Sequence, residues 1–520
     1  MTTQYAQKPE AGDRLDRAHV VGVVGSGAMG AGIAQVAAVA GHPVRMFDLR
    51  PGAAETAAHG LRRTLLKLAD KGRMTVSAAE QAGERLVAVT DLADLSDASL
   101  VVEAIVENLE AKRQLFVELE AIVGRHCILA SNTSSISITS IAAVLSEPGR
   151  FLGMHFFNPA PLMPLVEVVS GLATSPAHVE TVFATASAWG KTPVHARSTP
   201  GFIVNRVARP FYAEALRLLA ERASDEATID AVIREAGGFR MGPFELMDLI
   251  GHDVNYAVTC SVFDAFYQDP RFTPSQMQLE LVNAGWLGRK SGRGFFRYGE
   301  GVASPAPRTA PTVACPVRII AYPAGPVAQA LTARLKAARI PFVMARAPHA
   351  DGRLFDADEC IVHQTDGRSA TQRARDAAYQ HVALIDLMLD AGQARRVACS
   401  FADQSSSAAQ RAAIGLLQAA GLAVSRLDDV PGLAVMRTVA MLANEAAEAV
   451  QQGVCDAAGA DLAMLKGVNY PRGPLEWADS IGPAKLMTVL DNLARAYGED
   501  RYRCSTLMRR KAIGGTTFHA

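Results

Sequence analysis

Residues 20–30 read Val20-Val21-Gly22-Val23-Val24-Gly25-Ser26-Gly27-Ala28-Met29-Gly30, an apolar run with β-branched residues that leads into closely spaced glycines. Such a run predicts a buried strand of a parallel sheet. The Ala-rich residues 31–40 predict a helix after the glycines, and residues 44–48 predict a second strand. The order of strand, glycine-rich turn, helix and strand indicates a doubly wound α/β fold that binds a dinucleotide.

Each glycine of the turn has a physical role in this Rossmann interpretation. Gly25 allows the tight turn, Gly27 lets the backbone approach a pyrophosphate, and Gly30 lets the helix pack close to the strand. The free N–H groups at the helix start, around Ala28 and Met29, then face the phosphates. An ordinary glycine-rich turn is the alternative, and the flanking strand and helix disfavour it.

Asp48 ends the second predicted strand, about 20 residues beyond the glycines. A carboxylate at this point accepts hydrogen bonds from the ribose hydroxyls and repels a 2′-phosphate, so we expect NAD rather than NADP. Arg50 lies close by in the sequence and is the one feature against that choice, unless its side chain is solvated.

The bulk composition limits the kinds of partner. The 520 residues are enough for about three or four domains. The 52 Lys and Arg balance 52 Asp and Glu, so no global field attracts nucleic acid or a membrane surface. No apolar run is long enough for a transmembrane span, and residues 1–17 are polar and predict a flexible tail rather than a signal peptide. Seven scattered cysteines without a CxxC pair fit a reducing cytoplasm and argue against a metal site.

Further strands are predicted along the first 200 residues, and several polar residues follow them. Ligands of such sheets bind beyond the carboxyl ends of the strands. The residues that fall at such ends are Glu107, Asn132, Ser134 and His155. The predicted strands are 86–89, 100–105, 127–134, 151–157 and 165–169.

Four side chains are candidates for chemistry, although each has a plain structural alternative. His155 is either a base or a hydrogen-bonded histidine at a strand end, and Glu167 is either its partner or a surface carboxylate. Ser134 is either a hydrogen-bond donor in the site or a helix N-cap. Asn205 is either a second donor or a structural amide near a helix start.

The combination resembles the L-3-hydroxyacyl-CoA dehydrogenase family, including the 3-hydroxybutyryl-CoA dehydrogenases. The motifs occur in family order over residues 18 to about 300. They are Gly25-Ser26-Gly27-Ala28-Met29-Gly30, Val102-Glu103-Ala104-Ile105-Val106-Glu107-Asn108, Ser131-Asn132-Thr133-Ser134-Ser135, His155-Phe156-Phe157-Asn158-Pro159, Thr199-Pro200-Gly201-Phe202-Ile203-Val204-Asn205-Arg206 and Met241-Gly242-Pro243-Phe244-Glu245-Leu246.

The resemblance implies an enzyme that oxidises (S)-3-hydroxyacyl-CoA to 3-oxoacyl-CoA with NAD. It implies the catalytic residues Ser134, His155, Glu167 and Asn205, and the cofactor-binding residues Gly25, Gly27, Ala28, Met29, Gly30, Asp48, Glu107, Lys112, Asn132 and Lys290. The chemistry is independently reasonable, because a neutral imidazole is a suitable base at neutral pH and a carboxylate orients it.

The rest of the chain is predicted to be partly helical and partly duplicated. The predicted parts are a tail (1–17), a Rossmann domain (18–199), a helical domain (200–298), a linker (299–314), a degenerate α/β domain (315–428) and a second helical domain (429–520). Residues 315–428 contain a strand–helix–strand pattern without the glycines, and we interpret them as a non-binding relative of the first domain. An unrelated α/β insertion is the alternative.

The two helical domains repeat at one constant offset along the chain, which carries Pro200-Gly201 onto Pro431-Gly432. At this repeat offset Glu214 matches Glu445 and Gly242-Pro243 matches Gly473-Pro474, without a gap. Met436 replaces Asn205, so we predict that the second copy is structural. In the family the helical domain forms the dimer contact, so the resemblance implies an internal pseudo-dimer and leaves further self-association open.

The duplicated organisation is similar to that of bacterial 3-hydroxyadipyl-CoA and 3-hydroxybutyryl-CoA dehydrogenases, which implies a role in fatty-acid or phenylacetate breakdown by analogy. Two other functions stay open at this point. One is a dehydrogenase of small free hydroxy acids, and the other is a non-catalytic nucleotide-binding scaffold.

Overall fold

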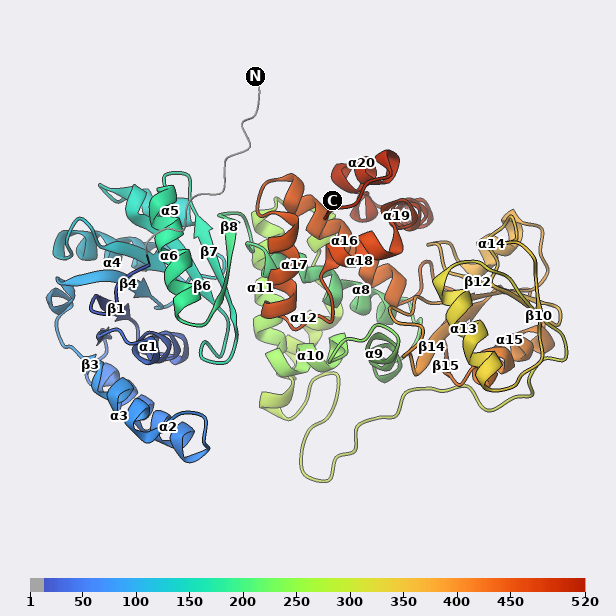
Figure 1. Cartoon of the computed structure of the whole chain (residues 1–520), viewed down its shortest axis with the longest axis horizontal. Helices are drawn as coiled ribbons and strands as arrows, with labels where there is room; N and C mark the ends of the chain where they lie inside the picture. The colour runs from blue at the N-terminus through green and yellow to red at the C-terminus, as the bar shows by residue number, and fades with distance from the viewer. Residues whose placement is uncertain (1–13, 520) are drawn as a thin grey trace, which may run out of the picture. The chain divides into compact units, whose positions relative to one another are not determined.

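The computed structural model describes residues 14–519 of the chain. These residues cluster into two compact units. Unit 1 comprises residues 14–206 and Gln452–Asn469, and unit 2 comprises Val207–Gln451 and residues 470–519. Figure 1 shows the elements of unit 1 mostly in blue and green. Among residues 14–519, no helix is both long enough and apolar enough to cross a lipid bilayer.

Unit 1 is built on an eight-stranded sheet with the order β3-β2-β1-β4-β5-β6-β7-β8. Strands β3 to β6 run parallel, β7 is antiparallel to β6, and β8 is parallel to β7. This is the expected Rossmann-type sheet. The strands are β1 (Val20–Val24), β2 (Val44–Phe47), β3 (Leu86–Ala88), β4 (Ala98–Glu103), β5 (Ile128–Ser131), β6 (Phe151–Phe156), β7 (Leu165–Ser170) and β8 (Thr192–Arg197).

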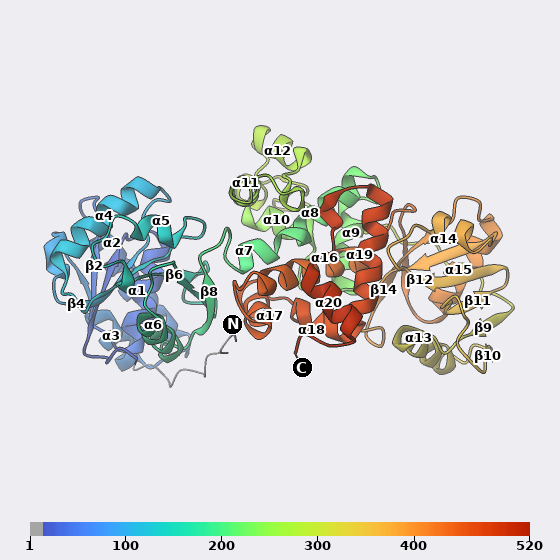
Figure 2. The same cartoon turned by 90° about the horizontal axis from the view of Figure 1, so that it is seen from above.

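Helices cover both faces of this sheet. Helices α1 (Ala28–Ala40) and α6 (Pro176–Ala188) lie on one face, and α4 (Leu109–Ile122) and α5 (Ile138–Ala142) lie on the other (Figure 2). The strand residues are apolar on both sides because both faces are covered, and every residue of β6 is buried. Helices α2 (Ala53–Asp70) and α3 (Val76–Glu84) connect β2 to β3, and the first of the two segments of unit 1 ends within α7 (Val204–Val207).

Two features of unit 1 differ from the prediction. The strand β8 was not predicted, and part of the predicted flexible tail is packed against the core. β8 alternates buried and exposed residues at the sheet edge, so its sequence carries no continuous apolar run. Leu15 packs against the core, and its N–H donates to Thr185 Oγ1 at 3.0 Å. The rest of the predicted flexible tail, residues 1–13, lies outside the described residues.

One segment of the predicted second helical domain belongs to unit 1. Helix α17 (Ala457–Gly467) packs against β7 and β8, and the Arg197 N–H donates to the Val454 carbonyl at 2.8 Å. Gly467 permits this packing, because a Cβ there would lie 2.6 Å from a Leu165 methyl carbon. Residues 429–520 were predicted to form one helical domain, but the structure divides them between the two units.

Unit 2 contains the helices of both repeats. The first set is α8 (Arg209–Ala220), α9 (Glu226–Glu235), α10 (Pro243–Ile250), α11 (His252–Ala265) and α12 (Gln276–Asn283). The second set is α16 (Val435–Gln451), α18 (Pro474–Ile481), α19 (Pro483–Tyr497) and α20 (Thr506–Gly514). Asp225 caps α9 by accepting from the Thr228 N–H, and α10 begins at Pro243 after Gly242.

Unit 2 also contains a seven-stranded mixed sheet, with the order β10-β9-β11-β12-β13-β14-β15. Here β11 is antiparallel to both neighbours and β13 is antiparallel to β14, so the α/β domain is not a plain parallel relative of the first. The elements are β9 (Ile319–Ala321), α13 (Pro326–Ala337), β10 (Val343–Met344), β11 (Phe355–Ala357), β12 (Cys360–Gln364), α14 (Ala370–Asp376), β13 (Val382–Ile385), β14 (Arg396–Phe401), α15 (Ser407–Ala419) and β15 (Ala423–Arg426).

The repeat extends backwards into this second sheet. When β7 and α6 are shifted by the repeat offset, they coincide with β14 and α15, and both ends of each element match. The strand β6 falls on β13 and β8 falls on β15 at their first residues. The antiparallel pairing of β6 with β7 also recurs between β13 and β14. We infer that the second half of this domain descends from the first domain.

The two helical repeats contact one another reciprocally within unit 2. Glu214 on α8 accepts from Arg501 at 3.0 Å, and Glu445 on α16 accepts from Arg271 at 3.1 Å. Glu445 is the repeat equivalent of Glu214, and each arginine comes from the other copy. Mutual use of one surface by two copies is the pattern of a twofold dimer interface.

The carboxylate of Glu214 on α8 joins several side chains of this contact. It is fully buried and accepts hydrogen bonds from Arg437, Arg501 and Tyr502. Burial raises the pKa of Glu214, but the charges of Arg501 and Arg437 outweigh it and hold the pKa below its ordinary value. The group is therefore ionised and needed as a counter-charge for two buried guanidinium groups.

We expect Glu214→Gln to lower the free energy of unfolding by about 3–5 kcal/mol, because buried arginines lose their counter-charge. Urea denaturation followed by circular dichroism measures the change as a lower midpoint at constant slope. Glu300→Gln, at an exposed position, is the matched control. A midpoint for Glu214→Gln equal to that of the control would contradict the prediction.

Candidate active site

The glycine turn has the shape required to hold phosphate groups. Gly25 has φ of 96°, and a Cβ there would lie 2.5 Å from the Ala104 carbonyl oxygen. A Cβ at Gly30 would lie 1.8 Å from the Gly25 carbonyl oxygen, whereas at Gly27 it would meet nothing within 4 Å. Helix α1 begins at Ala28, so the N–H groups of Ala28 and Met29 are without intrahelical partners beside the open space at Gly27. The turn therefore fits a pyrophosphate.

Asp48 lies directly after β2 and is already hydrogen-bonded. One carboxylate oxygen accepts from the Ser26 N–H at 2.8 Å and from its hydroxyl at 2.6 Å, and Arg50 Nε donates to the other at 3.0 Å. The Arg50 guanidinium holds the pKa of Asp48 well below its usual range. Arg50 is 73% exposed, so its side chain can move aside for ribose hydroxyls at little cost.

A buried charged network supports the loop that carries Ser134. Lys112 Nζ lies 2.5 Å from Glu103 Oε1 and 3.3 Å from Glu107 Oε2, and the lysine side chain is 1% exposed. Glu107 accepts from Thr133 Oγ1 at 2.6 Å and from the Ser134 N–H at 3.1 Å. Lys112 was predicted near the dinucleotide, but its ammonium group is enclosed by the two carboxylates.

The pKa of Glu107 is consistent with an ionised group. Burial raises this pKa, but the hydrogen bond from Thr133, the charge of Lys112 and the hydrogen bond from Ser135 bring it below its ordinary value. Glu103, which pairs with Lys112 in this network, was not singled out from the sequence. It ends the apolar strand β4 fully buried, and a carboxylate at the end of a buried strand was the signal that could have found it.

His155 and Glu167 face each other on neighbouring antiparallel strands. They are direct partners in the register of β6 and β7, and His155 Nδ1 lies 2.6 Å from Glu167 Oε2. His155 is 5% exposed and Glu167 is fully buried. A carboxylate only accepts, so Nδ1 carries the proton and donates it. The other ring nitrogen, Nε2, then holds a lone pair, which is the state required of a base.

The second oxygen of Glu167 positions the start of α7. Oε1 accepts from the Ile203 N–H at 3.1 Å and from the Val204 N–H at 2.9 Å. Asn205 is the next residue and is half-buried. One carboxylate therefore holds both the imidazole and the backbone beside Asn205.

Asn132 connects the Ser134 loop to the histidine strand. Its side-chain oxygen accepts from the Phe156 N–H at 2.8 Å, one residue beyond His155. Ser134 lies two residues after Asn132 and is half-buried. The structure thus brings the residues around Ser134, His155, Glu167 and Asn205 together within unit 1 by direct hydrogen bonds. Lys290 belongs to unit 2, where its Nζ lies 2.6 and 2.7 Å from the carboxylate oxygens of Asp253.

Comparison with known families covers most of the chain. A family model described as 3-hydroxyacyl-CoA dehydrogenase, NAD binding domain, matches residues 20–199. The C-terminal domain of the same family matches twice, over residues 201–298 and 432–516. A model described as 3-hydroxybutyryl-CoA dehydrogenase reduced Rossmann-fold domain matches residues 362–431.

Individual relatives agree with these matches. The chain is 43% identical to the 3-hydroxyadipyl-CoA dehydrogenase of Escherichia coli over 95% of this chain and 97% of that one. It is 40% identical to the mitochondrial hydroxyacyl-coenzyme A dehydrogenase of Sus scrofa over 54% of this chain and 90% of that one. A crystal structure of 3-hydroxybutyryl-CoA dehydrogenase from Escherichia coli matches with a TM-score of 0.87 and 42% identity, covering 95% of this chain and 98% of that one. The chain therefore belongs to the 3-hydroxyacyl-CoA dehydrogenase family and carries the family's NAD-binding domain.

Proposed function

We propose that this enzyme oxidises (S)-3-hydroxyacyl-CoA to 3-oxoacyl-CoA, with His155 as the base. The single observation that carries the proposal is the 2.6 Å hydrogen bond between His155 and the buried Glu167, which leaves Nε2 of His155 as a proton acceptor. NAD supplies the acceptor for the hydride that leaves C3. Glu167 fixes the imidazole tautomer and stabilises the imidazolium once the proton has moved.

Ser134 and Asn205 are proposed to bind the C3 oxygen. A hydroxyl and an amide can both donate to an oxygen on which negative charge develops as the proton leaves. The backbone of each residue is held by a buried carboxylate, since Glu107 accepts from the Ser134 N–H and Glu167 accepts from the N–H of Val204. Losing one such donor typically costs about 2.7–4 kcal/mol in the transition state.

The NAD site is proposed to use the glycine turn and the strand ends beyond it. Gly27, with Ala28 and Met29, offers open space and free N–H groups for the pyrophosphate, while Asp48 accepts the ribose hydroxyls. Gly25 and Gly30 shape the turn, and Glu107 and Asn132 lie at the ends of β4 and β5. Lys112 is proposed to act through Glu107, and the assignment of Lys290 rests on the family resemblance alone.

The second repeat is proposed to be structural. At the repeat offset, His155 falls on Asp386, Glu167 on Ala398 and Asn205 on Met436, so the base, its orienting group and one donor are all replaced. The fully buried Asp386 instead accepts from the N–H groups at the start of α16, at 2.7 to 2.9 Å. The carboxylate that anchors the helix start has thus moved to the neighbouring strand. The copy supplies an internal pseudo-dimer contact, supported by the reciprocal pairs of Glu214 and Glu445.

The acyl group and the setting are further proposals. A relative that matches nearly the whole chain is named for 3-hydroxyadipyl-CoA, and shorter relatives are named for 3-hydroxybutyryl-CoA. We propose one of these thioesters as the substrate, in fatty-acid or phenylacetate-type breakdown. A cytoplasmic location is supported by the seven cysteines, which are free thiols.

A direct assay distinguishes the candidate functions. NADH is mixed with the enzyme and with acetoacetyl-CoA, free acetoacetate or neither, and absorbance of NADH is followed. We expect consumption with the thioester alone. Consumption with the free acid would indicate a dehydrogenase of small hydroxy acids, and no consumption under any condition would indicate a nucleotide-binding scaffold. Either result would refute the proposed reaction.

A further inference from the structure

A short segment of the second repeat, residues 452–469, belongs to unit 1 and packs against the strand that carries Glu167. Its helix α17 contacts both this strand, β7, and the edge strand β8. A Cβ on Gly467 of α17 would lie 3.0 Å from a methyl carbon of Val204, so the surface of α17 also reaches the first residue of α7. The second repeat therefore touches the helical turn that carries Asn205.

The same segment holds the side chain of Arg206, the residue after Asn205. Arg206 Nη1 donates to Gln452 Oε1 at 2.8 Å. The arginine is 1% exposed, whereas Gln452 is exposed. A hydrogen bond from a charged donor is stronger than one between neutral groups, and a buried charge loses much when such a partner is removed. Gln452 is therefore one of the groups that fix the position of Arg206.

Asn205 lies between two anchors on α7. On its N-terminal side, the carboxylate of Glu167 accepts from two backbone N–H groups at 3.1 and 2.9 Å. On its C-terminal side, Arg206 donates to Gln452. The helix α7 has four residues, and the first four N–H groups of any helix lack an intrahelical partner. Its orientation therefore depends on contacts with other segments, which include these two.

The contact between Arg206 and Gln452 has a counterpart within unit 2. At the repeat offset, Arg206 matches Arg437 and Gln452 matches Glu221. Arg437 Nη1 donates to Glu221 Oε2 at 3.0 Å. Each arginine is thus bound by the equivalent position of the other copy. The copy that carries Asn205 uses a neutral amide as the acceptor, and the other copy uses a carboxylate.

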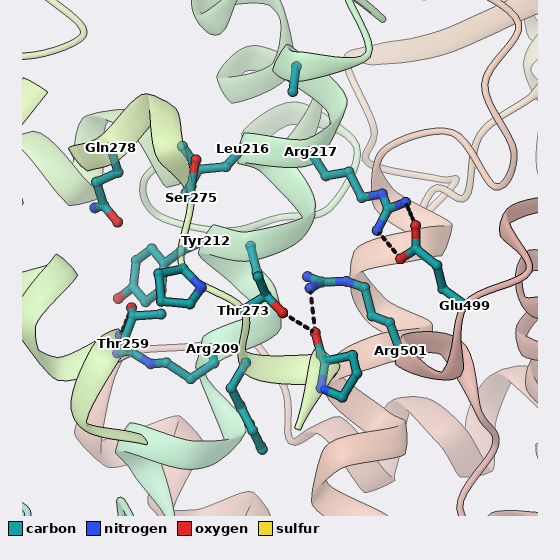
Figure 3. Close-up of a pocket in the computed structure, with 15 residues that line it drawn as sticks. Arg209, Tyr212, Leu216, Arg217, Thr259, Thr273, Ser275, Gln278, Glu499 and Arg501 are labelled. Carbon is teal, nitrogen blue, oxygen red and sulfur yellow. Dashed lines mark hydrogen bonds and ion pairs between the residues drawn. The ribbon is translucent and has the colours of Figure 1, made fainter. Parts of the chain in front are cut away.

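The counterpart contact belongs to a larger charged network. Glu221 also accepts from Arg217 Nε at 3.0 Å. Both Nη atoms of Arg217 donate to Glu499 at 2.6 Å, and Figure 3 shows this ion pair. These residues all belong to unit 2, as Arg437 does. Replacing Glu221 therefore removes the same kind of arginine contact without changing the partners of Arg206.

We propose that Gln452, contributed by the second repeat, is a positioning residue for the oxidation, which acts through Arg206 to hold the Asn205 amide at the C3 oxygen. This inference rests on the proposed function, in which Asn205 binds that oxygen. The second repeat lacks the catalytic groups, and its part in the reaction is to keep the α7 turn in one orientation. A displacement of about 1 Å caused by a distant substitution can lower a rate about 10²-fold, so a contact outside the site affects turnover.

Gln452→Ala is expected to lower kcat by about 10- to 100-fold, with little change in the KM for NAD. Steady-state oxidation of (S)-3-hydroxybutyryl-CoA or (S)-3-hydroxyadipyl-CoA, whichever the wild-type enzyme oxidises faster, measures both constants. Glu221→Ala, which removes the equivalent contact of Arg437, retains the wild-type kcat as the matched control. Gln452→Glu keeps an acceptor for Arg206 and retains kcat as well.

A double-mutant cycle establishes whether Gln452 acts through Asn205. Asn205→Ala alone is expected to lower kcat about 10²- to 10³-fold, as the loss of one donor to a developing oxyanion does. Gln452→Ala then costs nothing further in the Asn205→Ala background, because the amide that it positions is absent. A general loss of stability or of cofactor binding would instead lower kcat by the same factor in both backgrounds.

Three results each overturn the inference. They are a kcat for Gln452→Ala equal to that of Glu221→Ala, an equal loss in Gln452→Glu, and an equal loss in the two backgrounds of the cycle. If Gln452→Ala does not fold, Gln452→Asn, which shortens the side chain by one methylene group, takes its place under the same criteria. A wild-type kcat in Asn205→Ala, or a wild-type enzyme that oxidises neither thioester, contradicts the proposed function itself, and the inference falls with it.

Discussion

Replacing His155 by glutamine is expected to lower kcat by about 10²- to 10⁴-fold, the contribution of a positioned general base. Glutamine occupies a similar volume on β6, but its amide does not accept a proton at neutral pH. The neighbouring backbone is held by β5 and β7 and by the Asn132 hydrogen bond to Phe156, so the fold should persist. Steady-state kinetics of the oxidation of (S)-3-hydroxybutyryl-CoA with NAD measure kcat.

NADH binding separates a chemical defect from a binding defect. His155 lies on β6, whereas the glycine turn and Asp48 lie at β1 and β2, so the Kd for NADH should be unchanged in a fluorescence titration. His195→Gln on β8 is the control, because this histidine is exposed and lies outside the site. A kcat near that of the control would remove His155 from the mechanism.

Glu167→Gln is expected to lower kcat by about 10⁴-fold, the loss seen when an orienting carboxylate becomes an amide. The glutamine carbonyl can keep accepting from Ile203 and Val204, which directs its NH₂ group at His155. Nδ1 of His155 must then accept, so the proton moves to Nε2. A protonated Nε2 in a neutral ring cannot take the substrate proton.

This prediction is distinguishable from a loss of stability. Since the carbonyl retains the two backbone hydrogen bonds, the melting temperature should fall little, and kcat should fall with little change in KM. Glu180→Gln on α6 is the control, because Glu180 is a partly exposed partner of His195. A Glu167→Gln enzyme with a kcat close to that of the control would contradict the role of the carboxylate.

The glycine turn illustrates what can be predicted locally. The strand, the three glycines and Asp48 all lie between Val20 and Asp48, and each requirement is a property of this one short segment. The predicted β1 and β2 agree with the structure to within one residue. The strand β8 was missed because an edge strand with one exposed face lacks the apolar run that marks a buried strand.

The pair of His155 and Glu167 illustrates the opposite case. They are 12 residues apart in the chain, and the sequence left Glu167 either as the partner of His155 or as a surface carboxylate until the family resemblance favoured the pair. Their hydrogen bond depends on the antiparallel register of β6 and β7, and a shift by one residue would turn each side chain to the other face. Glu103 and Lys112 were likewise not recognised as a buried ion pair, because burial is a property of the packed fold.

Residues close together in the chain were thus sufficient to establish the Rossmann-type first sheet and the phosphate turn, and matching residues at one constant offset established the duplication. Local propensity and hydrophobic period act over a few residues, and a repeat is visible wherever side chains recur. Packing alone assigned α17 to unit 1 and enclosed Lys112 between two carboxylates. Those outcomes depend on contacts between segments that are far apart in the chain. Such contacts determine which charged groups are shielded from water, and local sequence does not specify them.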